Sequence, residues 1–365
     1  MRQISISYAE PGMIVARNVF NADGKVLLAA GMPLKESYIE RIKGLGIRRI
    51  YIKDDTVGDL DIPDVISEKT RVATTKTVKA IFSDLKTNSK INLEPIKATV
   101  NNIIDEVLQN RNILVNLTDV RCYDDYTFGH SVNVCLLSVL TGVSIGYNSS
   151  QLRDLGTGAI LHDLGKTKID VEIINKPGKL TPAEYEEIKK HTEVGFEILR
   201  RMPEIPLLSA HVAFQHHEKL DGSGYPRGLK QDEIHEFARI VAVADVYDAL
   251  LADRSYRKGY LPHQALEIVT SSTEAHFDPT VVAAFIDNIA VYPIGSLVEL
   301  STGEVGIVVD VNRGLQTKPI VRILFSHTGE RVKFLREIDM GKISTIYIAR
   351  VYSEEMSFSL FKQYR

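Results

Sequence analysis

The run from Ser131 to Leu152 carries no formal charge, and no other stretch restricts the fold of this chain as strongly. A run of this length either crosses a membrane or forms a helix that is buried in a protein core. Serine, threonine and asparagine side chains recur within it, together with Gly142 and Gly146, and such residues are costly in lipid. We therefore predict a core helix that ends near Gly146, and no membrane span.

The composition is that of a globular protein with room for two or three domains, since 44% of its 365 residues are hydrophobic and 25% are charged. A formal net charge of −3 argues against a protein that coats a polyanion, so long nucleic acid is not expected as a partner. Cys122 and Cys135 form no paired motif, and the N-terminus lacks the pattern of a secretory signal. We expect a reducing, cytoplasmic setting.

The pattern of apolar residues predicts a mainly α protein in four parts. Ile4 and Ile6 alternate with polar residues, and Asn21 to Gly24 has the composition of a hairpin turn, which favours a small α+β accessory domain. Apolar residues at helical spacing follow, and after about residue 290 short β-type runs take over. We place these parts at residues 1–62 (α+β), 63–120 (linker helices), 121–290 (helical bundle) and 291–365 (β-rich). The amphipathic linker helices favour a homodimer.

Most of the ten histidines lie between residues 130 and 217, inside the predicted bundle. His162 and Asp163 follow an apolar stretch at a predicted helix end, and Thr181-Pro182 is a strong start for the helix that carries His191. We expect His211, His216 and His217 to lie on the next helix. Asp245 lies within an apolar helix, where a carboxylate is costly unless a cation or a metal pairs with it. Imidazole and carboxylate ligands without cysteine suit first-row divalent metals such as Fe, Mn, Zn or Ni.

These residues suggest two metals bridged by Asp163. The first would be held by His130, His162 and Asp245, and the second by His191, His216 and His217. A bridged pair of metals generates a hydroxide suited to in-line attack on phosphorus. Lys166, Arg254 and Arg257 would neutralise the phosphate oxygens, so the predicted chemistry is phosphoester hydrolysis.

The motifs resemble the HD-GYP subgroup of the HD-domain phosphohydrolases. The resemblance covers about residues 121–288 and rests on His162-Asp163, on the string from His216 to Pro226 (HHEKLDGSGYP), and on Asp245-Val-Tyr-Asp248. It implies an HD-type helical bundle that hydrolyses cyclic di-GMP to pGpG or onward to GMP, with bridged metals that are commonly iron or manganese.

The resemblance also assigns roles to individual residues. The metal ligands would be His130, His162, Asp163, His191, His216, His217 and Asp245, and the phosphate-binding cations would be Lys166, Arg254 and Arg257. Independently of the resemblance, Gly224, Tyr225 and Pro226 lie in a loop directly after His216-His217, where we expect contact with the substrate or a protein partner; a tight turn alone would also explain the glycines and the proline. Members with a third metal carry Glu four residues before the first ligand histidine, where this chain has Tyr126, so we expect two metals.

Other interpretations stay open. The bundle could hydrolyse another cyclic dinucleotide or nucleotide, or it could bind cyclic di-GMP as a sensor without turnover. His211 is interpreted as a surface residue or an outer partner of the ligands. His235, His263, His276 and His327 lack a motif and are assigned structural roles.

Overall fold

The computed structural model describes residues 1–365 except 22–24, 88–91, 111–112, 116–125, 177, 254–257 and 364–365. The chain divides into two compact units, each described by itself below. Unit 1 comprises Met1–Asp64, Asn112–Tyr126 and Ile289–Arg365, and unit 2 comprises Val65–Arg111 and Thr127–Asn288. The prediction of a mainly helical chain with a small N-terminal strand and helix region and a β-rich C-terminal region is confirmed.

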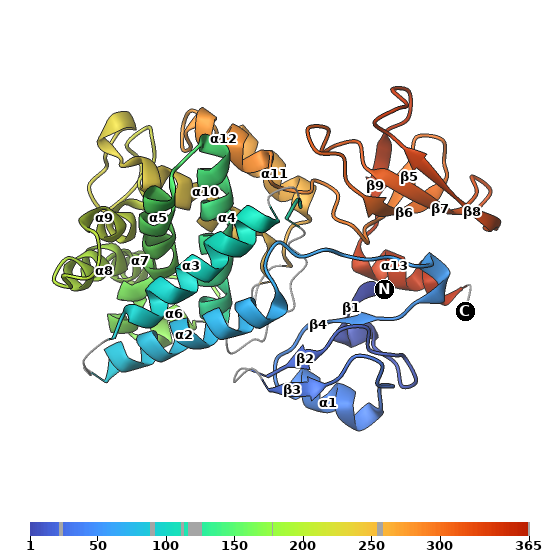
Figure 1. Ribbon diagram of the computed structural model, residues 1–365, viewed down its shortest axis with the longest axis horizontal. Helices are drawn as coiled ribbons and strands as arrows, with labels where there is room; N and C mark the ends of the chain where they lie inside the picture. The colour runs from blue at the N-terminus through green and yellow to red at the C-terminus, as the bar shows by residue number, and fades with distance from the viewer. Residues whose placement is uncertain are drawn as a thin grey trace. The chain divides into compact units, whose positions relative to one another are not determined.

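Unit 2 is a bundle of α-helices and holds the predicted metal ligands (Figure 1). Its elements are α2 (Glu68–Lys86), α3 (Glu94–Gln109), α4 (Tyr126–Ile145), α5 (Ser149–Leu161), η4 (Leu164–Lys168), α6 (Val171–Ile174), α7 (Pro182–Lys189), α8 (His191–Leu199), α9 (Leu207–Gln215), η5 (Gln231–Glu233), α10 (Glu236–Leu251), α11 (Pro262–Ser271) and α12 (Pro279–Ile286). Helix α3 packs on α2 and α5, and α9 packs on α5, α8 and α10.

Helix α4 is the uncharged helix predicted from the sequence, and it ends at Ile145, next to Gly146 with φ +95°. Its side chains from Val132 to Leu140 are buried, including the polar Asn133 and Ser138. Among the described residues, one window, Phe128–Ile145, is long and apolar enough to cross a membrane, and 72% of it is buried inside the structure. The helix thus forms part of the core of unit 2.

Two predicted helix boundaries differ from the structure. The capping box of Thr181 and Glu184 begins α7 as predicted, but α7 ends at Lys189, and His191 is the first residue of the separate helix α8. Lys190 closes α7 with a tight turn, its backbone N–H donating to the Glu187 carbonyl, which separates the two helices. Likewise, α9 ends at Gln215, so His216 and His217 follow the helix.

Unit 1 combines the two ends of the chain. Its N-terminal part contains β1 (Arg2–Ser5), η1 (Ile6–Tyr8), β2 (Val19–Phe20), β3 (Val26–Leu28), α1 (Glu36–Gly44), β4 (Arg49–Ile52) and η2 (Asp55–Val57). Strand β1 pairs antiparallel with β4, and β2 with β3. The C-terminal part is a five-stranded antiparallel sheet in the order β8-β7-β6-β5-β9, followed by α13 (Glu354–Lys362). These strands are β5 (Leu297–Leu300), β6 (Val305–Asp310), β7 (Ile320–Phe325), β8 (Arg331–Asp339) and β9 (Ile348–Val351).

The two parts of unit 1 contribute to a common buried cluster. Leu60 and Ile62 pack in the same cluster as Leu297, Phe325 and Phe361. The acidic segment 54–62 therefore contributes core residues. The predicted four-part division of the chain stays a prediction.

Candidate metal centre

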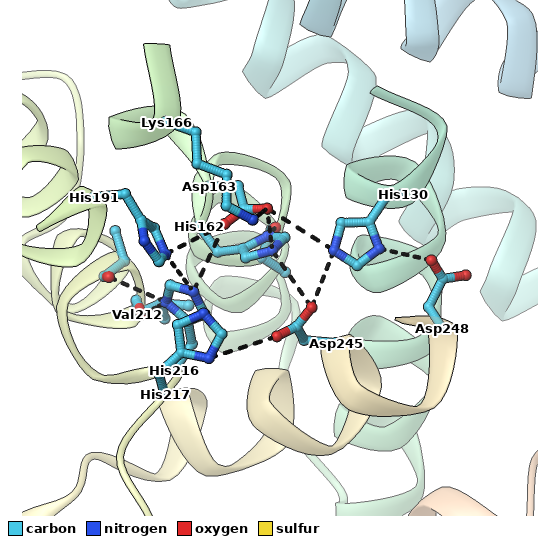
Figure 2. Close-up of polar contacts among 12 residues, drawn as sticks. His130, His162, Asp163, Lys166, His191, Val212, His216, His217, Asp245 and Asp248 are labelled. Atoms are coloured by element: carbon cyan, nitrogen blue, oxygen red, sulfur yellow. Dashed lines mark hydrogen bonds and ion pairs between the residues drawn. The ribbon is translucent and has the colours of Figure 1, made fainter. Parts of the chain in front are cut away.

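The structure brings all seven predicted metal ligands together from five different segments of unit 2 (Figure 2). They are His130 on α4, His162 and Asp163 at the end of α5, His191 at the start of α8, His216 and His217 after α9, and Asp245 in α10. His130, His162 and Asp245 form a first ligand group, and Asp163, His191, His216 and His217 form a second ligand group. Within each group, the potential ligand atoms lie within 4.8 Å of one another.

Asp163 faces both groups, with one carboxylate oxygen toward each. Its Oδ2 lies 3.4 Å from His162 Nε2 and 3.9 Å from His130 Nε2. Its Oδ1 lies 3.5 Å from His191 Nε2 and 3.8 Å from His216 Nε2. A carboxylate in this position can bridge two metal ions.

Asp245 completes the first group and also reaches the second. Its Oδ1 lies 3.0 Å from His130 Nε2 and 4.0 Å from His162 Nε2, and its Oδ2 lies 3.9 Å from His217 Nδ1. The carboxylate is buried among apolar residues of α10, so its polar contacts are with the imidazoles and not with bulk water. The two aspartates thus lie between five imidazole rings.

Backbone carbonyls orient three of the imidazoles. His162 Nδ1 is 2.7 Å from the Ala159 carbonyl, His191 Nδ1 is 2.6 Å from the Ile188 carbonyl, and His216 Nδ1 is 3.0 Å from the Ala213 carbonyl. A carbonyl only accepts hydrogen bonds, so each Nδ1 carries the proton and each Nε2 presents its lone pair to the cluster. This tautomer is the one that binds a metal through Nε2.

Gly165 allows the segment after Asp163 to approach α8. A Cβ atom at this position would lie 1.9 Å from the His191 carbonyl oxygen and 2.6 Å from the Gly195 backbone nitrogen. Any larger residue would separate the two backbones. Gly165 thereby holds Asp163 and His191 close together.

The charges of the cluster follow from burial and from these contacts. Burial and the charge of Lys166 lower the pKa of His191 to about 4, and burial lowers the pKa of His217 to about 3. Burial opposes the charged form of His130, but hydrogen bonds to Asp245 and Asp248 raise its pKa to about 9. Despite burial, the charge of Lys166 and the imidazole of His162 hold the pKa of Asp163 well below its usual value. At neutral pH the second group thus offers neutral imidazoles and a carboxylate anion, the forms that bind metals.

The donor set and its unsatisfied atoms fit divalent metals. Among the described residues, His162 Nε2 and Asp163 Oδ1 are buried and have no hydrogen-bond partner. Buried polar atoms are nearly always paired, so a cluster that leaves one such atom in each ligand group unpaired is suited to a ligand that takes lone pairs. Nitrogen and oxygen donors without sulfur suit Fe, Mn, Zn or Ni.

Lys166 lies against the cluster, with its Nζ 2.6 Å from Asp163 Oδ2 (Figure 2). Its side chain is 30% exposed, whereas that of Asp163 is 2% exposed. Lys166 therefore lies at the border between the buried carboxylate and solvent. The phosphate contact predicted for it stays a prediction.

The loop after His217 packs on the ligands. The Tyr225 ring stacks on His217, with ring centroids 4.7 Å apart, and the Tyr225 N–H donates to the His217 carbonyl at 3.2 Å. A Cβ at Gly224 would lie 2.4 Å from the Lys219 backbone nitrogen, so the tight turn requires glycine there. These contacts show that Gly224 and Tyr225 support His217. The substrate or partner contact predicted for Gly224, Tyr225 and Pro226 is not tested by them.

Two residues beside His130 were not assigned a role from the sequence. His130 Nδ1 is 2.6 Å from Asp248 Oδ2, and Asn133 Nδ2 donates to Asp248 Oδ1 at 2.9 Å. Both are fully or almost fully buried. The signal was spacing, since Asn133 follows His130 by three residues and Asp248 follows Asp245 by three, which places each pair on one helix face.

Several predictions fall on parts of the chain that the structure leaves out. Arg254 and Arg257 lie outside the described residues, and the side chain of Tyr126 is not described either. His211 packs against Phe196 with ring centroids 4.9 Å apart and is not part of either ligand group. The phosphate contacts of the two arginines and the limit of two metals stay predictions.

The fold and the clustered ligands define a class of protein, a helical bundle built around adjacent His and Asp residues. Residues 129–281 match the family described as HD domain, and residues 297–359 match a KOW domain associated with the HD domain. Residues 129–281 are therefore an HD domain, and the predicted resemblance to the HD-GYP proteins is confirmed.

Individual relatives agree with this assignment. A Pseudomonas aeruginosa protein named cyclic di-GMP phosphodiesterase is 34% identical over 265 residues, which are 73% of this chain and 64% of that protein. A Vibrio cholerae protein named 3'3'-cGAMP-specific phosphodiesterase 3 is 38% identical over 159 residues, which are 44% of this chain and 34% of that protein. The chain thus spans less than two thirds of the length of either relative.

A solved structure shares the fold. It is that of a Bdellovibrio bacteriovorus protein described as an HDG"Y"P protein, and it covers 78% of this chain and 98% of its own. The TM-score is 0.51 and the sequence identity is 18%, so the likeness concerns the fold alone.

Proposed function

We propose that the chain is a metal-dependent phosphodiesterase that hydrolyses cyclic di-GMP to pGpG or onward to GMP, with two divalent ions held by the two ligand groups. The position of Asp163 carries the proposal, because its two oxygens face different groups at 3.4 to 3.9 Å. A carboxylate is costly to bury, and one that lies between two sets of imidazoles is placed to bridge a pair of metals.

Each group of residues would have a distinct role in hydrolysis. The first ligand group and the second ligand group would each hold one ion, Asp163 would bridge them, and the ions would activate water for attack on phosphorus. Lys166, at the edge of the buried cluster, would bind a non-bridging phosphate oxygen. Arg254 and Arg257 would add further positive charge, and the GYP residues 224–226 would contact the nucleotide. Iron or manganese is the expected metal.

A second candidate substrate has a specific observation in its favour. The HD domain of this chain is similar both to a protein named for cyclic di-GMP and to one named for 3'3'-cGAMP. Both substrates are cyclic dinucleotides with two 3'-5' phosphodiester bonds, so the metal ligands alone do not separate them. A sensor without turnover would use the same site for binding alone.

The test measures metals and products in the same samples. Protein purified anaerobically is analysed for metal content and then given cyclic di-GMP, 3'3'-cGAMP and cyclic di-AMP in parallel at equal metal loading. About two metals per chain and fastest formation of pGpG from cyclic di-GMP support the proposal. Faster hydrolysis of 3'3'-cGAMP supports the second candidate, and two metals with tight binding but no product support a sensor.

A further inference from the structure

We propose that Arg71 is a positioning residue for the metal ligand His130, acting through Asn133 and Asp248, and that the first turns of α2 thereby set metal affinity. The proposal rests on the metal site proposed above. Three hydrogen bonds form the connection, which we call the Arg71 relay. Arg71 Nη1 donates to Asn133 Oδ1 at 2.8 Å, Asn133 Nδ2 donates to Asp248 Oδ1 at 2.9 Å, and Asp248 Oδ2 lies 2.6 Å from His130 Nδ1.

The chemistry of each group fixes the direction of the relay. His130 Nε2 faces Asp245 and the cluster, so its Nδ1 is the nitrogen that donates outward, to Asp248. An ionised carboxylate only accepts, so Asn133 must turn its NH2 group toward Asp248. The amide oxygen of Asn133 then points the other way, where only a donor can satisfy it. A guanidinium has five N–H donors and no acceptor, and Arg71 meets this requirement.

Burial makes the relay sensitive to the loss of Arg71. Asp248 is 0% exposed and Asn133 is 2% exposed, so water does not readily replace a lost partner. Without Arg71, the Asn133 amide oxygen would be left buried and unpaired. If the Asn133 amide rotated to place its oxygen elsewhere, that oxygen would face the Asp248 carboxylate, and two acceptors cannot form a hydrogen bond with one another. In either case the hydrogen bond that orients the His130 ring is weakened.

Helix α2 is hydrogen-bonded near both ends to neighbouring elements of unit 2. Near its start, the N-cap Ser67 and Thr70 both donate to Glu106 of α3. Near its end, Lys168 Nζ donates to the Leu85 carbonyl at 2.8 Å, and Lys168 lies in η4, directly after the segment of Asp163. In sequence, α2 begins at Glu68, four residues after the first segment of unit 1 ends at Asp64. A shift of the first turns of α2 is therefore carried to His130 through three hydrogen bonds.

The experiment compares R71M with R71K and with a matched control on the same helix. Lys69 is exposed on α2, two residues before Arg71. K69M therefore removes a positive charge from the same helix at a position outside the relay. Stepwise Mn2+ affinities of metal-free protein are measured by competition with a fluorescent chelator. Changes to outer partners of metal-bound histidines typically cost about 10–100-fold in affinity. We expect R71M to weaken one of the two binding steps by about tenfold, R71K to weaken it less, and K69M to leave both steps unchanged.

Two further measurements separate positioning from a general loss of stability. At saturating Mn2+, R71M should recover most of its kcat and keep the wild-type KM for cyclic di-GMP. The double variant R71M/N133A should bind Mn2+ no more weakly than N133A, because Arg71 acts on His130 only through Asn133. Additive losses would instead indicate two independent effects and would overturn the relay.

The outcomes also distinguish this inference from the proposed function. If the wild-type chain binds two Mn2+ ions and R71M and R71K bind them within twofold of wild type, only the relay is wrong. If the wild-type chain binds no Mn2+, Fe2+ or Zn2+, the metal site itself is wrong and the relay fails with it.

Discussion

Each unit buries charged side chains, and the two units do so in different ways. In unit 1, the side chains of Arg2 and Asp54 are 5% and 6% exposed and lie 2.8 Å apart. Arg2 also stacks on Phe361, with its guanidinium carbon 4.2 Å from the ring centroid, and Asp54 accepts the Thr56 N–H. In unit 2, Asp163 and Asp245 are buried among five imidazoles at mostly 3.4 to 4.0 Å, and two atoms of the cluster have no hydrogen-bond partner among the described residues.

The difference separates a structural from a functional use of buried charge. In the Arg2–Asp54 pair, a permanent cation lies directly against a carboxylate, so removal of the pair should affect folding and little else. In the ligand cluster, imidazole nitrogens and carboxylate oxygens that can bind metals face one another, so its removal should chiefly affect the binding of ions. The four predictions that follow test this contrast.

The largest expected effect is on turnover. Asp163→Asn keeps the shape of the side chain but removes the charge that faces both ligand groups. We expect loss of both ions and a fall in cyclic di-GMP hydrolysis of more than about a thousandfold, because both ions that activate water depend on this carboxylate. Elemental analysis and product chromatography measure the two effects. Retention of two tightly bound ions in this variant would contradict the bridging role.

The next effect is on folding. Removal of one partner of a buried ion pair typically costs about 3–5 kcal/mol. We expect Asp54→Asn to destabilise unit 1 by about that amount in urea unfolding, while metal content stays at the wild-type level. Arg17–Asp64 is a matched control in the same unit, since its side chains are 24% and 31% exposed, and Asp64→Asn should cost much less. Equal losses for the two variants would show that burial is not what distinguishes the pairs.

Metal binding should stabilise unit 2 in particular. An ion present at a hundred times its Kd stabilises the state that binds it by about 2.7 kcal/mol. We therefore expect Mn2+ to slow hydrogen exchange in α5, α8 and α10 of the wild-type chain and of Asp54→Asn, but not of Asp163→Asn. Protection by Mn2+ that spread equally over unit 1 would argue against a site confined to the bundle.

The smallest expected effect is on how the stability of unit 1 depends on pH. Burial disfavours the Asp54 carboxylate, but hydrogen bonds from Thr56 and the Arg2 charge lower its pKa below the usual value of 3.8. A lowered pKa in the folded state means that this stabilisation is complete above about pH 4 and is lost as the pH falls through the folded-state pKa. The stability of unit 1 between pH 5 and pH 2 should therefore fall more steeply in the wild type than in Asp54→Asn. Parallel profiles would contradict the prediction.

The sequence was a good guide to the ligands because each of them is expensive to bury. Asp245 in an apolar helix and adjacent His-Asp and His-His pairs stand out by chemical type, and the structure brings them together. Helix boundaries were less accurate, since the end of α7 at Lys189 depends on a local turn that no residue type signals.

Two features were missed for physical reasons. Strand β8, from Arg331 to Asp339, is mostly charged and exposed, so it lacks the alternation that predicts a strand and is held by its pairing with β7. The Arg71 relay joins residues 62 and 115 positions apart, and contacts over such separations follow from packing, not from spacing along the chain.

The common buried cluster of unit 1 also determines when each part of the chain can fold during synthesis. Apart from the segment near residues 112–126, unit 2 is continuous in sequence from Val65 to Asn288, so its contacts are available once that stretch has left the ribosome. Leu60 and Ile62 are synthesised before the bundle, whereas Phe361, which packs in the same buried cluster, is synthesised after it. These two side chains must therefore wait for the bundle and the sheet before they are buried, and meanwhile they are exposed apolar residues that a chaperone would cover.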